Sequence, residues 1–142
     1  MASATKAPTK SAEPVDLRSD KLYWHFLQSD KKLRYDDGRV VRIGVTLKHD
    51  GPLVLCKSGM HGCKRAIDAL EYAPGPIICR VKLGGKILHE TDKSVAQSRT
   101  VLAMADATNV LHEFACRCAE TALKTAKVED ERCWKAIETK RH

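Results

Sequence analysis

The sequence has no long apolar run, and this argues against a membrane-spanning helix. Its longest apolar stretches, such as residues 52–56, run for about five residues, whereas a helix that crosses a bilayer needs about 20. Residues 1–22 also lack the apolar region of a secretory signal peptide. We therefore expect a cytoplasmic protein with no membrane partner.

Aromatic residues are also scarce, at 5% of the chain. The core needs most of them, so few remain as stacking platforms for a ligand. Trp134 lies in an otherwise charged stretch, and it either serves a partner or folds back onto the sheet. Cysteine is better represented, with six residues. Without a signal segment, we interpret these cysteines as reduced thiols or metal ligands rather than disulfides.

The 142 residues are enough for one domain that buries a core without a disulfide or a metal. Residues 1–20 almost lack large apolar side chains, so we expect a disordered tail there. Residues 21–127 are predicted to form the folded domain. Residues 128–142 are a charged extension that could be a short helix.

Positive charge is concentrated in the middle of the chain. The sequence carries 25 basic and 18 acidic residues, a net charge of +7, and residues 21–90 contribute 13 basic against 7 acidic residues. A localised basic face suggests an acidic partner, either nucleic acid or an acidic protein. The alternative is an ordinary solvated surface.

Alternation of apolar and polar residues predicts several strands. Residues 21–28 read as a strand, residues 41–48 give the clearest alternation, and residues 53–56 read as a short buried strand. Residues 77–83 read as another strand. In it we expect Cys79, Val81 and Leu83 to face inward and Arg80 and Lys82 to face outward.

The segment after this strand contains a turn signal at Gly84-Gly85. We expect residues 86–89 to return antiparallel from that turn. Residues 92–98 predict a short helical turn with Asp92 as its cap.

Helical spacing predicts two helices and an α+β fold class. Residues 63–73 form a short helix that Pro74-Gly75-Pro76 ends, and residues 107–127 form a long one. The apolar stripe of the long helix passes through Cys118, which we therefore assign to the core; His112 and Cys116 are flank residues or a metal pair. The fold is a mainly antiparallel sheet packed by one long C-terminal helix and one short helix.

The loop from Cys56 to Cys63 is the one segment that suggests metal chemistry. Cys56, His61 and Cys63 are soft ligands of the kind zinc prefers, and Cys79, His49 or His89 could complete a tetrahedron. The spacing is not a common zinc pattern. The alternative is that both cysteines pack as small apolar residues.

A catalytic interpretation centres on the same loop. His61 lies at a strand-to-helix junction, and Tyr23 and His25 of the first strand could join it. Ser58 or Cys63 could act as a nucleophile, although the sequence does not identify an orienting acid. Asp92 and Glu113 are the candidates for that role.

A basic sheet face is the third candidate site. If the strands at 41–48 and 77–83 share a sheet, their cations could project from one face and the loop at 31–34 could extend it. The predicted binding residues are Arg42, Lys48, Arg80, Lys82, Lys31, Lys32 and Arg34.

Several segments carry a resemblance to a known family. LCKSGMHGC at 55–63, DALEYAPG at 68–75 and VKLGG at 81–85 are followed by Asp92-Lys93 and by an FA-x3-A pattern at 114–119. Over residues 22–125 the chain resembles small, largely uncharacterised proteins encoded by bacteriophages and prophages. The shared signature falls on Cys56, Gly59, His61, Asp68, Ala69, Leu70 and Tyr72. The resemblance implies an accessory role such as host takeover or blocking a host defence, in the host cytoplasm.

Three functions are therefore carried forward. The first is a phage-type accessory protein that binds nucleic acid or an acidic host protein through the basic sheet face. The second is an enzyme that acts on a nucleotide or a nucleic acid end at His61. The third is a small binding domain stabilised by zinc.

Overall fold

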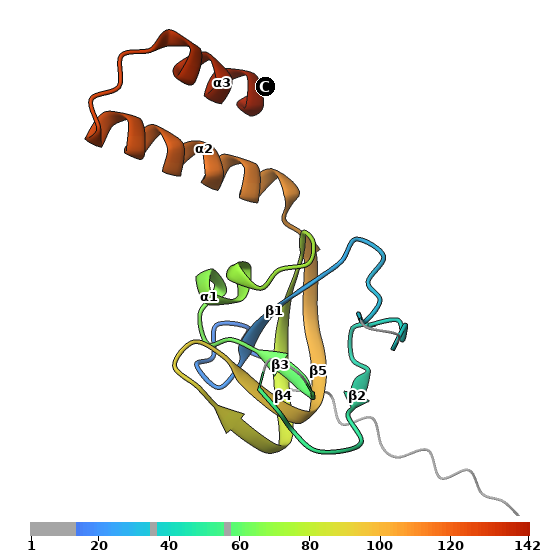
Figure 1. Cartoon of the computed structure of the whole chain (residues 1–142). Coiled ribbons are helices and arrows are strands. Elements are labelled where there is room, and N and C mark those ends of the chain that lie inside the picture. The colour runs from blue at the N-terminus through green and yellow to red at the C-terminus, as the bar shows by residue number, and fades with distance from the viewer. Residues whose placement is uncertain (1–13, 35–36, 56–57) are drawn as a thin grey trace, which may run out of the picture.

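The computed structural model describes residues 14–34, 37–55 and 58–142, which form an α+β fold as predicted (Figure 1). The strands are β1 (Tyr23–Leu27), β2 (Thr46–Lys48), β3 (Met60–Gly62), β4 (Ile77–His89) and β5 (Ser94–Asp106). The helices are α1 (Ala66–Glu71), α2 (Thr108–Thr125) and α3 (Glu131–Arg141). None of the helices in these ranges is long and apolar enough to cross a bilayer.

The five strands form one antiparallel sheet that curls into an incomplete ring. β4 pairs with β1 on one side and β5 on the other, and β2 and β3 follow one another along the far edge of β5. Immediately after β3, the backbone of Cys63 exchanges two hydrogen bonds with Trp24 of β1, at 2.6 and 2.8 Å. This bridge closes the ring at one end, whereas the rest of β1 lies apart from β3.

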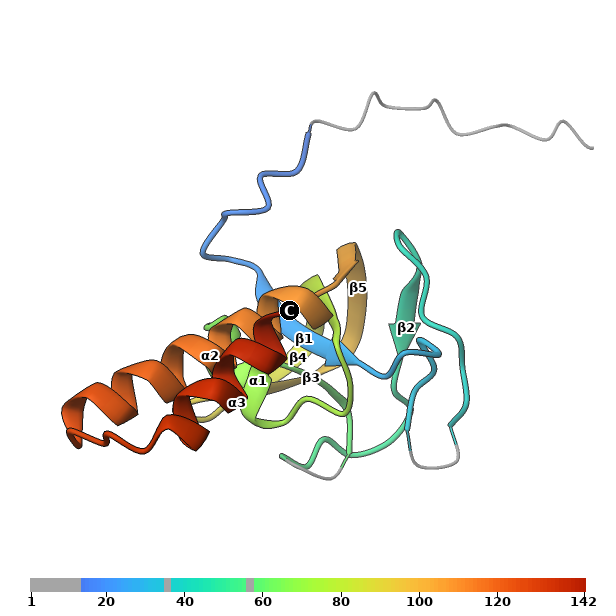
Figure 2. The ribbon, with the colours of Figure 1, turned by 90° about the horizontal axis from the view of Figure 1, so that it is seen from above.

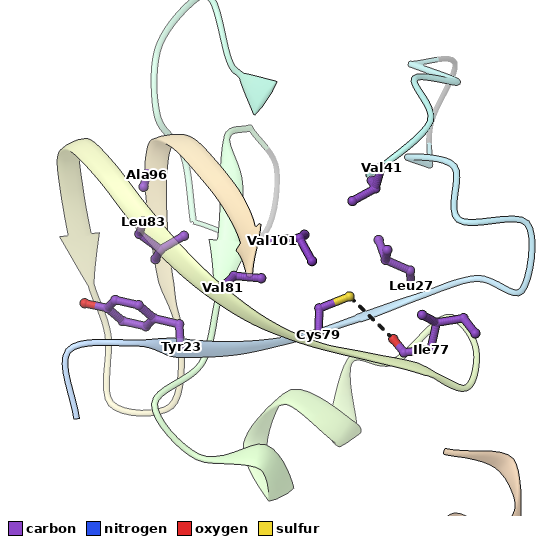
Figure 3. Close-up of a cluster of buried hydrophobic side chains, with 9 residues drawn as sticks. All are labelled: Tyr23, Leu27, Val41, Ile77, Cys79, Val81, Leu83, Ala96 and Val101. Atoms are coloured by element: carbon purple, nitrogen blue, oxygen red, sulfur yellow. Dashed lines mark hydrogen bonds between the residues drawn. The ribbon is translucent and has the colours of Figure 1, made fainter. Parts of the chain in front are cut away.

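The inner face of the ring holds the main core (Figure 3). The inward positions of β4 alternate as the sequence predicted, because Cys79 and Val81 are fully buried while Lys82 is exposed. The core consists of Tyr23, Leu27, Val41, Ile77, Cys79, Val81, Leu83, Ala96 and Val101. It draws residues from both long strands and from the loop before β2, so this loop is part of the folded body.

The outer face of β1 carries a second, smaller cluster. Phe26, Cys63 and Ala69 are buried there, so α1 covers the outer side of β1. Leu111, from the first turn of α2, packs against the same cluster. α2 therefore starts on the body of the protein.

Beyond that first turn, α2 leaves the sheet and pairs with α3 (Figures 1 and 2). The Cys116 thiol donates to the Ile137 carbonyl oxygen, and both residues are buried. Arg141 of α3 pairs with Glu113 and Glu120 of α2. The charged extension at 128–142 is thus the second helix of a hairpin.

The predicted apolar stripe of α2 is not its buried stripe. Cys116 is buried and Cys118 is exposed, the reverse of the prediction. Val110 and Phe114, which lie at helical spacing on the same apolar stripe as Cys118, are 70% and 43% exposed. Helical spacing identified the apolar side of this helix, but α3 packs against a different side.

Two predicted strands before β3 are also wrong in part. Only residues 46–48 of the segment at 41–48 pair in a strand, because Gly44 has a φ of +82° and its N–H donates to the Val101 carbonyl. The left-handed backbone at Gly44 breaks the extended run. Val54, in the segment predicted as a buried strand, is 42% exposed and forms only an isolated bridge with Ser58.

The prediction of a turn at Gly84-Gly85, with residues 86–89 returning antiparallel, is wrong as well. β4 passes through both glycines and continues to His89, and its pairing with β5 shifts register between Gly84 and Ile87. Gly85 adopts a φ of +71°, a conformation that favours glycine. In this strand the glycine pair therefore forms a β-bulge and not the turn that such a pair often indicates. Residues 94–98, predicted as helical, belong to β5, and the short helix predicted at 63–73 covers only 66–71.

Candidate functional site

The open side of the ring contains a cleft of about 610 Å³. Beyond the Trp24–Cys63 bridge, β1 and β3 no longer pair with each other, and the cleft lies in the gap between them. Both strands therefore form walls of the cleft. Its walls come from β1, β3, the end of α1, the loop after β1, and Arg99 of β5. The gap gives side chains of both sheet faces access to the same space.

Arg99 is the most unusual residue of this cleft. It is 4% exposed and faces inward in register with Leu47 and Leu83. Its Nη1 donates to the His61 carbonyl oxygen at 2.8 Å. Burial lowers the pKa of Arg99 to about 10, which leaves it charged at neutral pH. No carboxylate within the described ranges pairs with this buried charge, which faces the cleft.

Two histidines stand beside this arginine. Burial, then the charges of Arg99 and His61, hold the pKa of His25 well below its usual value. Burial also lowers the pKa of His61, against a hydrogen bond to the backbone of Gly59 that raises it. Both rings are therefore neutral at pH 7, and each neutral imidazole offers one donor and one acceptor nitrogen.

The rim of the cleft is fixed by a contact between α1 and the β4–β5 turn. The Tyr72 hydroxyl donates to Asp92 Oδ2 at 2.6 Å, which raises the pKa of Tyr72 to about 12. Lys93 Nζ lies 5.1 Å from the centre of the Tyr72 ring. This contact holds the ammonium group of Lys93 at the mouth of the cleft.

Positive charge outweighs negative charge along these walls. Asp37 is bound by Arg39 at 2.7 Å, and this bond lowers the pKa of the Asp37 carboxyl. The charged side chains among the described lining residues are Lys32, Arg34, Lys93 and Arg99 against Asp37 and Glu71. The cleft therefore favours an anionic occupant.

The structure brings together two of the three residues proposed for catalysis. His25 and His61 both line the cleft, His25 from the inner face and His61 from the outer. Tyr23 does not line it; its ring stacks on His89 with the centroids 6.4 Å apart and lies under the Lys64 ammonium. Ser58 lines the cleft as well.

The predicted binding residues are spread over three places. Lys32 and Arg34 line the cleft, whereas Lys31 and Arg42 are exposed outside it. Lys48 and Lys82 are exposed on the outer face of the sheet. Arg80 shares that face but is 8% exposed, and its guanidinium lies 4.3 Å from the centre of the Trp24 ring.

The proposed zinc ligands are not all placed. Cys56 lies outside the described residues. Burial and the nearby Asp92 and Asp68 raise the pKa of Cys63 to about 11, so this thiol is protonated at neutral pH. Among the residues that the structure describes, no group of three ligands could hold a metal ion. His112 is exposed, while Cys116 is buried against α3.

Sequence reasoning missed Arg99 and Lys93 as site residues. Residues 92–98 were predicted as a helical turn, so no inward position was assigned to Arg99. The available signal was a strand pattern in which Arg99 stands two residues from Val101 and so on the same face. Arginine at an inward strand position is rare enough to mark a site.

Comparison with protein families decides the classification. Residues 25–113, from within β1 to the start of α2, match the model of a domain of unknown function, DUF7666. The chain belongs to this family. The DUF7666 match includes the described lining of the cleft except Trp24, and it ends close to where α2 leaves the body. No curated protein and no solved structure gives a significant match. The phage origin expected from the sequence stays a prediction.

Proposed function

We propose that this DUF7666 protein binds a nucleotide, or the terminal nucleotide of a nucleic acid strand, in the cleft, with the phosphate on Arg99. The observation that carries the proposal is the burial of Arg99 without a carboxylate among the described residues. A buried guanidinium is costly to desolvate unless an anion compensates it. The planar group is suited to bidentate binding of phosphate oxygens.

The surroundings of Arg99 support a phosphate. The neutral ring of His25 can donate one hydrogen bond to a phosphate oxygen, and His61, which is bonded to the Gly59 backbone, lies beside it. Arg34 and Lys93 add positive charge farther out at the wall of the cleft, where Lys93 also pairs with Glu90 at 3.5 Å. A ligand whose phosphate binds deep in the cleft and whose remainder extends outward would contact both the inner groups around Arg99 and the outer cations; we call these the two layers of the cleft.

The rest of the cleft favours a base over a bare anion. Its volume of about 610 Å³ lies in the range of small-ligand sites, and inorganic phosphate would fill little of it. Phe26, Leu33, Met60 and Tyr72 provide apolar and aromatic walls. Aromatic rings beside cations are the surroundings that bind a nucleobase together with its phosphate.

Isothermal titration calorimetry with adenosine monophosphate, adenosine and inorganic phosphate tests the proposal. We expect adenosine monophosphate to bind about tenfold or more tightly than either part alone, because the whole ligand uses both layers of the cleft. Arg99→Lys should weaken binding by about tenfold or more, since lysine keeps the charge but loses the bidentate geometry. Arg42→Lys is the matched control, because Arg42 is exposed outside the cleft.

Three results would contradict the proposal. Absence of binding by all three compounds rejects a nucleotide site. Equal affinities for the nucleotide and inorganic phosphate reject recognition of the base. Equal losses in Arg99→Lys and Arg42→Lys reject the assignment of Arg99. Product formation during the titration, followed by chromatography and abolished in His61→Ala, would extend the proposal to the enzyme predicted at His61.

A further inference from the structure

We infer that the outer face of the sheet binds single-stranded nucleic acid, and that the segment at 14–21 covers part of this surface in the free protein. The surface consists of Arg80 with Trp24 beneath it, Lys82 and Lys48. Its cations lie apart from the interior charge of the cleft, because Arg99 points inward and they point outward, whereas Trp24 also lines the cleft. The inference does not depend on nucleotide binding in the cleft.

Arg80 is held in place by groups that carry no charge. Its Nε donates to the Leu17 carbonyl at 2.7 Å and its Nη2 to the Ser19 carbonyl at 2.8 Å. Nη1 is buried and has no hydrogen-bond partner among the described residues. Burial lowers the pKa of Arg80, and no carboxylate among the described residues forms an ion pair with it. Within the part of the chain that the structure describes, the guanidinium therefore has no carboxylate partner and has one unused donor.

The covering segment is weakly attached. All of its residues are exposed except Ser19, which is partly buried. Besides the two bonds from Arg80, the described segment accepts a hydrogen bond from Lys64 Nζ at the Asp20 carbonyl, at 2.6 Å, and one from the Leu22 N–H at the Ser19 carbonyl, at 3.2 Å. Backbone carbonyls thus occupy two cations at once. Phosphate oxygens would make stronger, charge-assisted bonds with the same cations, so a polyanion can displace the segment.

The surface continues from Arg80 along the sheet. Lys82 is in register with Thr100, whose hydroxyl lies 2.6 Å from that of Thr46. Lys48 of β2 is in register with Ser98. Cations and hydroxyls therefore alternate across three strands, and both kinds of group contact phosphates and sugars in nucleic acid complexes.

Two features favour a single strand over an acidic peptide. Arg80 stacked on Trp24 presents a flat group on which an unpaired base can lie once the segment at 14–21 is removed. The neighbouring hydroxyls of Thr46, Thr100 and Ser98 suit phosphate and sugar oxygens. An acidic peptide has no base to stack, so it would use the charges alone.

Fluorescence anisotropy with a labelled single-stranded thymidine 20-mer measures this binding. Lys82→Glu should lower the affinity by about tenfold, since it replaces a phosphate contact with a repulsion. Lys135→Glu makes the same charge change on the exposed side of α3 and should have little effect. Equal effects of the two variants would show a response to net charge only, and no binding at low salt would reject the surface.

A glutamate 20-mer as competitor separates the two kinds of partner. Under the inference it displaces the oligonucleotide at least tenfold less effectively than unlabelled thymidine 20-mer. Equal competition would assign the surface to acidic polymers in general and overturn the nucleic acid assignment. Saturating adenosine monophosphate should leave oligonucleotide binding unchanged. Competition by this compound would place both ligands in the cleft, overturn the surface, and leave the proposed function standing.

Limited trypsin digestion tests the displacement itself. Arg18 lies in the covering segment with its side chain 94% exposed, and Lys127 lies in the loop between α2 and α3 as an internal reference. A bound oligonucleotide should speed cleavage after Arg18 about threefold or more relative to cleavage after Lys127, because the released segment fits the protease better. An unchanged or slower cleavage after Arg18 would show that the segment stays in place.

Discussion

Arg80 and Arg99 offer a comparison between the two faces of the sheet. Both are buried and neither pairs with a described carboxylate. Arg80 is covered by the protein's own chain, through the Leu17 and Ser19 carbonyls. Arg99 has one carbonyl bond and faces an open cleft. The buried guanidinium is thus covered by the protein on the outer face, whereas on the inner face it can be reached by a ligand in the cleft. This difference is why we assign the proposed function to the cleft.

The sharpest test of this comparison replaces each arginine with methionine. Arg99→Met should abolish nucleotide binding and raise the stability of the free protein by about 1–3 kcal/mol, because it removes a buried charge that no carboxylate of the described residues pairs with. Arg80→Met should instead lower stability, since it releases the segment at 14–21 and loses the contact with Trp24. Thermal unfolding of both variants gives the comparison, and a loss of stability in Arg99→Met would refute it.

Acid should destabilise the free protein through the two histidines of the cleft. Their folded pKa values lie below the usual 6.5, so the unfolded chain binds more protons as the pH falls below that value. The free energy of unfolding therefore decreases between about pH 6.5 and pH 5, by up to about 1.4 kcal/mol per pH unit for each histidine that is protonated only in the unfolded chain. Urea unfolding at several pH values measures this slope, and His25→Gln should flatten it more than His112→Gln does.

Nucleotide affinity should follow pH in the opposite direction. A bound phosphate favours the charged form of His25 and His61, so binding takes up protons and tightens as the pH falls from 8 to 6. The increase should stay within about tenfold per pH unit for each proton taken up. Calorimetry in buffers of different ionisation enthalpy counts the protons. Proton release on binding would mean that the phosphate does not reach the histidines.

The smallest expected effect is at the rim. Tyr72→Phe removes the hydrogen bond that ties α1 to Asp92, and so loosens the position of Lys93. We expect nucleotide affinity to fall by less than tenfold while the Arg99 phosphate contact is kept. Tyr23→Phe is a control outside the cleft. A loss as large as that of Arg99→Lys would move the centre of the site from the inner face to the rim.

The sequence correctly predicted the strand at residues 77–83, with one inward and one outward face, but it did not predict the cleft. Alternation in residues 77–83 correctly separated Cys79 and Val81 from Lys82, since that strand is paired on both sides and keeps a period of two. The cleft arises from a missing pairing between β1 and the β3 end, at residues about 40 positions apart. Local patterns do not report such a gap, and they identified His25 and His61 only as candidates.

The prediction at 41–48 failed for a different reason. Its apolar alternation was real, but Gly44 turns the backbone and leaves Ile43 57% exposed while Val41 enters the core. The α2 stripe failed because helical spacing shows where apolar residues lie and not which neighbour will cover them. In both cases tertiary contacts, rather than residue pattern, decided which side chains were buried.

The connection between β4 and β5 has a consequence for how the cleft is assembled during synthesis. These two long strands are joined by a four-residue turn, so they can pair as soon as both have left the ribosome. β1 is made first, but its partner Ile77 lies 50 positions after Leu27, so β1 has to wait for it. The edge of β1 that borders the cleft is thus set in place late. A nascent chain that stalls before residue 77 would expose the apolar side chains of β1 and have no site to offer a ligand.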